Sequence, residues 1–169
     1  MVMIYYGAYV GEAIKIANRG AILSPLEEEI EFLKTHHKPD AKNKLAMEIN
    51  SGKSFEELAI EGLKGQYNER EFEQRVRNVF VRPDLASALL DIRGINGLVL
   101  AVETDLKINL NIPQILIPKS VNIKALKEVH MRNVDQPDIE RVKEAFSKYD
   151  PNFICTAYLP ISFPFAQLI

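Results

Sequence analysis

The spacing of apolar residues predicts a strand followed by an amphipathic helix at the amino end of the chain. Residues 2–6 are β-branched and aromatic, and Gly7 follows them, so we expect a short buried strand. Apolar residues recur at helical spacing over residues 9–18, and Gly20 stands where a left-handed cap would end a helix.

Further helical segments follow in the first half of the chain. Two of them begin with the capping-box pattern, at Ser24 and at Ser54, and Asp40 is expected to cap a third. Residues 68–75 carry many charges and predict a mostly solvated helix. Together these segments form a helical insertion over about residues 25–76.

Strand-like segments dominate the second half. They are expected at residues 78–82, 98–102, 114–117 and 128–132. The last of these alternates and predicts an edge strand, with His130 on the surface. Helices are expected after Pro83-Asp84 and over residues 138–149, and Gly94 and Gly97 bracket a turn. This segregation predicts an α+β fold, with the helices concentrated in the N-terminal half around a small mixed or antiparallel sheet.

The domain organisation expected from this pattern is a single α+β domain over residues 1–152. Residues 153–169 form an apolar C-terminal tail that contains Pro160 and Pro164, which interrupt regular structure. A tail of this kind must cover its own domain or a partner, and we expect it to pack on its own domain.

Composition narrows the function classes. The 169 residues include 47% hydrophobic residues, and the formal charge is −2. These values exclude an intrinsically disordered chain and give no global attraction to nucleic acid or to an anionic membrane. The single cysteine, Cys155, excludes an internal disulfide and a multi-cysteine zinc site. Without a signal-like N-terminus or a long apolar run, we expect a cytoplasmic protein that does not enter membranes.

Candidate chemistry is sparse in the sequence. His36 and His37 are adjacent, whereas two metal ligands on one helical face lie three or four residues apart, so no metal site is expected. Arg77 and Arg82 flank a predicted strand and could bind a phosphate bidentately. The alternative is a mixed-charge surface in which neighbouring glutamates neutralise the arginines.

The order of several short phrases resembles the ADP-ribosyltransferase-like fold, in particular its branch of DNA-modifying toxins and RNA 2′-phosphotransferases. The phrases lie at residues 5–8, 13–24, 79–82, 84–89, 97–103, 114–118 and 121–129. The first reads Tyr-Tyr-Gly-Ala, where the family typically has Tyr-His-Gly-Thr. The resemblance implies a cleft for NAD or a nucleotide phosphate, lined by Tyr5, Tyr6, Gly7, Arg82 and Gln114. Arg77, singled out above from the charge pattern, is a further candidate for cofactor binding.

Three positions depart from the family pattern. Tyr6 replaces the histidine that orients the nicotinamide ribose, and Ala8 replaces threonine or serine. Gln114 replaces the catalytic glutamate and carries no negative charge, so the electrostatic stabilisation of the transition state is lost. Tyr6 and Gln114 are therefore the candidate catalytic residues of a domain with lost or altered transferase activity. NAD is the candidate substrate, and a nucleotide or nucleic-acid end is the candidate partner.

Two alternatives stay open. In the first, the chain is a non-enzymatic protein-interaction module that binds a partner or itself through residues 153–169. In the second, it is an unrelated small α+β protein in which the family phrases occur by chance.

Overall fold

The computed structural model of the protein describes residues 1–92 and 96–158 and has an α+β fold, as expected. The chain divides into two compact units. The sheet unit comprises the described residues of Met1–Gly20, Val81–Ile115 and Asn122–Ile169. The helical unit comprises Ala21–Phe80 and Leu116–Val121. The expected single domain over residues 1–152 stays a prediction.

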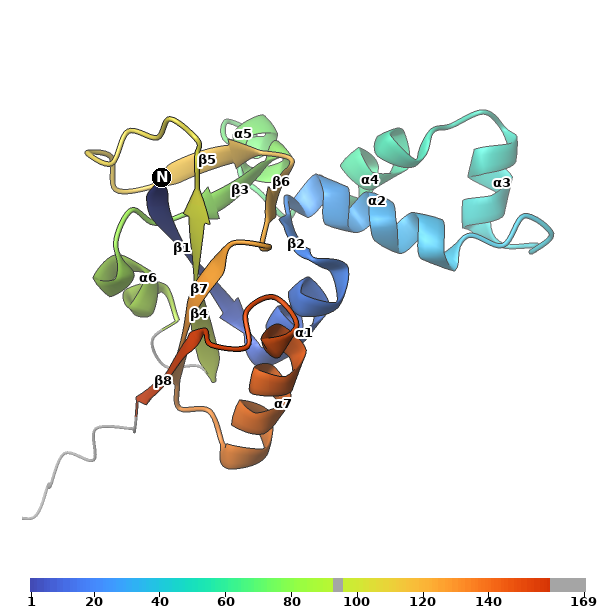
Figure 1. Cartoon of the computed structure of the whole chain (residues 1–169). Helices are drawn as coiled ribbons and strands as arrows, with labels where there is room; N and C mark the ends of the chain where they lie inside the picture. Colours follow the sequence, from blue (N-terminus) through green and yellow to red (C-terminus); the bar gives the residue numbers. More distant parts are fainter. Residues whose placement is uncertain (93–95, 159–169) are drawn as a thin grey trace, which may run out of the picture. The chain divides into compact units, whose positions relative to one another are not determined.

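A four-stranded sheet forms the centre of the sheet unit (Figure 1). Its order is β1 (Val2–Tyr9), β4 (Gly97–Thr104), β7 (Leu126–Arg132) and β8 (Ile154–Tyr158). The pairs β1–β4 and β4–β7 are antiparallel, and β7–β8 is parallel. Residues 97–102 of β4 are buried, because two strands flank β4 and helices pack on both faces.

The predicted edge strand over residues 128–132 was wrong in its position. This segment belongs to β7, which lies between β4 and β8, because residues 154–158 of the expected tail pair with it. His130 is consequently buried rather than on the surface, with 5% of its area exposed. The remainder of the tail, residues 159–169, and the turn glycine Gly94 lie outside the described residues.

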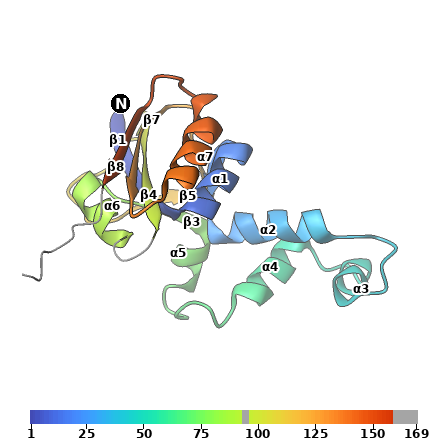
Figure 2. The ribbon, with the colours of Figure 1, turned by 90° about the horizontal axis from the view of Figure 1, so that it is seen from below.

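Helices cover both faces of the sheet (Figure 2). One face packs against α1 (Val10–Arg19) and α7 (Gln136–Ser147), whose residues Ile16 and Phe146 are almost fully buried. The other face packs against α6 (Leu85–Asp91). Helical periodicity on the sequence predicted all three helices, because each must bury one apolar stripe against the sheet.

The helical unit contains four helices and short strand pairs. The helices are α2 (Pro25–His36), α3 (Lys44–Asn50), α4 (Phe55–Leu63) and α5 (Phe72–Arg77). The paired strands are β2 (Ala21–Leu23) with β6 (Ser120–Asn122), and β3 (Asn78–Val81) with β5 (Ile115–Pro118). A cluster of Leu26, Ala59, Leu63 and Val76 holds α2, α4 and α5 together. Val76 is the fully buried residue of α5, whereas residues 68–75 are exposed apart from the half-buried Phe72, as expected for a mostly solvated segment. The helix begins only at Phe72, later than predicted.

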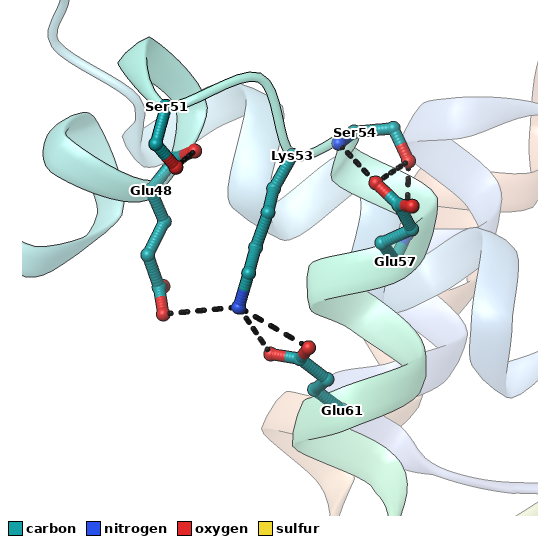
Figure 3. Close-up of polar contacts among 6 residues, drawn as sticks. All are labelled: Glu48, Ser51, Lys53, Ser54, Glu57 and Glu61. Atoms are coloured by element: carbon teal, nitrogen blue, oxygen red, sulfur yellow. Dashed lines mark hydrogen bonds and ion pairs between the residues drawn. The ribbon is translucent and has the colours of Figure 1, made fainter.

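Local polar contacts fix the ends of these helices. Ser54 and Glu57 form the predicted capping box at the start of α4 (Figure 3). In the preceding loop, the Lys53 ammonium contacts Glu48 at 3.6 Å and Glu61 at 3.1 Å, which ties α3 to α4. The predicted cap Asp40 was wrong: Asn43 caps α3, because its side chain accepts a hydrogen bond from the Ala46 amide at 2.8 Å.

Candidate functional site

Three segments far apart in the sequence meet beside β1 in the sheet unit. Tyr5 and Arg82 exchange two backbone hydrogen bonds, at 3.0 and 2.8 Å. The Arg82 guanidinium then donates from Nη1 to the carbonyl of Pro113 at 2.9 Å, directly before Gln114. Tyr5, Arg82 and the segment that leads to Gln114 are therefore brought together, and Gln114 itself is half-buried directly before β5.

The Arg82 side chain is held mainly by Asp91 of α6. Nε and Nη2 donate to the two carboxylate oxygens of Asp91 at 2.7 and 2.8 Å, in a bidentate ion pair. The hydrogen bond to Asp91 raises the pKa of Arg82 above its ordinary value. A guanidinium carries more N–H donors than these contacts and the Pro113 carbonyl use, so a phosphate could bind beside Asp91 or take its place.

Helix α6 packs closely on β1 at Gly7. A Cβ atom at Gly7 would lie 2.9 Å from Cγ2 of Ile92, so the absence of a side chain permits this approach. Tyr5, which lies on the same face of β1, is half-buried and packs against the cluster of Ala88, Ile92 and Val99. Burial raises the pKa of the Tyr5 phenol, and the carboxylates of Glu128 and Asp84 add to the effect.

Two of the predicted site residues lie apart from this group. Tyr6 points to the opposite face of β1, because side chains alternate along a strand, and its hydroxyl donates to Glu12 at 2.6 Å. Arg77 belongs to the helical unit. Its guanidinium donates to Glu73 at 2.5 Å and to Glu56 at 3.0 Å, and the bond to Glu73 is the main reason that its pKa is raised.

A polar network on β7 and β8, centred on the buried His130, was not predicted from the sequence. His130 Nε2 lies 2.7 Å from a carboxylate oxygen of Glu128, and His130 Nδ1 lies 3.1 Å from the hydroxyl of Tyr158. If Nε2 carries the proton donated to Glu128, Nδ1 accepts the proton of Tyr158. Carboxylate, imidazole and phenol are thus connected in sequence by hydrogen bonds, and such a chain of groups can transfer a proton.

Part of this network could be inferred from the sequence. Glu128 and His130 are two residues apart, so they share a face of any strand that contains both. Tyr158 could not be assigned to them because the parallel pairing of β7 and β8 joins residues far apart in the chain. In the sheet register Tyr5 lies opposite Ala101, and Ala101 lies opposite Glu128, so the network is on the same face as the Tyr5 side chain.

Within residues 1–92 and 96–158, no group of three His, Cys, Asp or Glu side chains could hold a metal ion. In the same part of the chain, none of the helices combines the length and the apolar character needed to cross a bilayer. The sequence matches no known family model, and a comparison with curated proteins finds no match.

Proposed function

We propose that the chain contains an ADP-ribosyltransferase-like domain that binds NAD or another nucleotide phosphate beside β1 of the sheet unit. The observation that carries the proposal is the meeting of Tyr5, Arg82 and Pro113, joined by hydrogen bonds of 2.8–3.0 Å. The resemblance implies that the first strand and the segment at Gln114 share one site. The contact from Arg82 to the Pro113 carbonyl supports this part of the proposal.

Each residue has a distinct role in the proposed site. Arg82 binds a phosphate oxygen with its remaining N–H donors and positions Gln114 through the Pro113 carbonyl. Tyr5 offers the edge of a half-buried ring to the base or the nicotinamide. Gln114 can donate and accept hydrogen bonds, but it cannot stabilise the positive charge that develops when nicotinamide leaves. Transferase activity is therefore lost or depends on another carboxylate. Glu128 is the candidate, because its charge contributes to the raised pKa of Tyr5 in the same site.

Binding is tested by thermal shift with NAD, ADP-ribose and a nucleotide 2′-phosphate. A ligand at 100 times its dissociation constant stabilises the folded state by about 2.7 kcal/mol. For a chain of this size that corresponds to roughly 5–10 °C in Tm. Gln114→Ala should reduce the shift, whereas Gln66→Ala, a matched change in the helical unit, should leave it unchanged. The absence of a shift with all three ligands contradicts the proposal.

Catalysis is tested by restoring the charge. Gln114→Glu places a carboxylate where the family pattern has one, so we expect nicotinamide release from NAD to rise by at least about tenfold. Combining it with Arg82→Lys should remove the gain, because lysine cannot hold Asp91 bidentately and Pro113 at the same time. If Gln114→Glu binds NAD but releases no nicotinamide, the domain is a binding module only.

A second candidate function is protein interaction through β8. In the described part of the chain β8 pairs with β7 alone, and Ile154 on this strand is 57% exposed. Exposed edge strands pair readily with other chains. We therefore compare the solution mass of the full chain with that of Ile154→Lys. A dimer that the lysine disrupts supports self-association, and a monomer in both cases rejects it.

A further inference from the structure

A cavity of about 510 Å³ lies within the helical unit, where the starts of α2 and α4 meet the end of α5 and the turn between β5 and β6. Its volume falls within the range of small-molecule sites. All its lining residues belong to the helical unit, so the cavity is separate from the site proposed beside β1. Leu26 and Pro118 give it an apolar wall.

The charges that line the cavity differ in how far they are neutralised. Arg77 is held by Glu73 and Glu56, so this group of three is satisfied internally. Lys119 and Glu27 also line the cavity, and across residues 1–92 and 96–158 neither side chain has an ion-pair partner. The cavity thus offers one free cation and one free carboxylate beside an apolar surface.

The backbone of Lys119 is strained at this point. Its φ of 64° is left-handed, a conformation that glycine and asparagine adopt far more readily than lysine. Two backbone hydrogen bonds hold it there, from the Lys119 amide to the Arg77 carbonyl at 2.9 Å and from the Ser24 amide to the Lys119 carbonyl at 2.7 Å. Strain of this kind gathers at functional sites. Glycine would fit this turn at lower cost, so the lysine is not explained by the backbone conformation.

We propose that this cavity binds a small zwitterion, an amino acid with a large apolar side chain or a dipeptide. Its carboxylate pairs with Lys119, its ammonium pairs with Glu27, and its apolar part packs on Leu26 and Pro118. An inorganic anion fits less well, because three carboxylates line the cavity against two cations. A simple cation fits less well because it would be repelled by Lys119. This inference does not depend on nucleotide binding by the sheet unit.

The ligand class is tested by titration calorimetry of the full chain with a panel of apolar amino acids and dipeptides. We expect saturable binding by at least one of them. The N-acetyl derivative removes the ammonium and the C-terminal amide removes the carboxylate, so each should weaken binding at least tenfold. If no member of the panel binds, or if the capped derivatives bind as well as the parent, the proposal is overturned.

Variants separate the ligand role of Lys119 from a structural one. Lys119→Gly relieves the backbone strain, so we expect Tm to rise while binding falls at least tenfold. Lys119→Arg should retain binding, Glu27→Gln should weaken it at least tenfold, and the exposed control Lys64→Gln should leave it unchanged. Binding that survives in Lys119→Gly overturns the assignment. Binding of inorganic phosphate in place of the zwitterion overturns the ligand class.

Discussion

A methyl group added at Gly7 should destabilise the protein through one atom of Ile92. The new Cβ would lie 2.9 Å from Ile92 Cγ2, whereas its next neighbours, at 3.6 and 3.8 Å, are at ordinary distances. The Cγ2 methyl is attached directly to Cβ of a β-branched side chain, so it cannot swing away easily. Overpacking of this kind costs about 1–3 kcal/mol. Alanine regains about 0.5–1 kcal/mol over glycine in a strand, so Gly7→Ala should lose about 0.5–2 kcal/mol.

The assay is a double-mutant cycle measured by urea denaturation. Ile92→Leu removes the γ2 methyl at nearly constant volume and should cost less than about 1.5 kcal/mol by itself. In that background Gly7→Ala should be neutral or stabilising, which gives a coupling of about 1 kcal/mol or more. If the two changes are additive, the close approach of α6 does not explain the glycine. A loss of nucleotide binding at unchanged stability would instead assign Gly7 to the ligand site.

Three further outcomes follow from the structure. His130→Ala should destabilise the protein by about 2–4 kcal/mol in urea denaturation, because it leaves a buried position empty and removes the hydrogen-bond partner of Glu128. Tyr158→Phe removes one hydrogen bond and should cost at most about 1 kcal/mol. Equal losses in the two variants would refute the network. Hydrogen bonds from the Ser87 amide and hydroxyl hold the pKa of Asp84 below its ordinary value, so its charge stabilises the fold above pH 4 and this contribution is lost as pH falls through the folded pKa. In thermal melts, the difference in stability between the natural protein and Asp84→Asn should therefore disappear between pH 5 and pH 2. A difference that does not change with pH would contradict this prediction. Burial raises the pKa of the Cys155 thiol. The rate of alkylation by iodoacetamide should therefore rise at a higher midpoint pH in the folded protein than in the urea-unfolded chain. Identical pH dependence in the two states would show an exposed thiol.

Local sequence determinants accounted for most helices. The caps at Ser24, Ser54 and Asp84 and the left-handed Gly20 all lie where the pattern placed them, because capping involves residues three or four apart. The failures involved contacts between distant residues. The position of β7 depends on a partner strand at residues 154–158, and no local pattern specifies that partner.

The candidate site was predictable only in part. The proximity of Tyr5 and Arg82 comes from a backbone bridge between residues far apart in the chain, which no local pattern specifies. The separation of Tyr5 and Tyr6 follows from strand alternation and could have been deduced once residues 2–6 were assigned to a strand. The contacts of Arg77 with Glu56 and of Arg82 with Pro113 could not be deduced from the sequence, since these pairs lie far apart in the chain and meet only when it folds.

The pairing of β1 with β4 places Tyr9 opposite Gly97, with the whole helical segment between them in the chain. The entropy of closing this loop rises only slowly with length, but contacts so distant in sequence slow the folding reaction. During synthesis the first strand, which carries the apolar residues Ile4 and Ala8, must wait for β4 to leave the ribosome. Strand β1 is thus synthesised well before the strand that it pairs with, and its edges stay unpaired until β4 has been made.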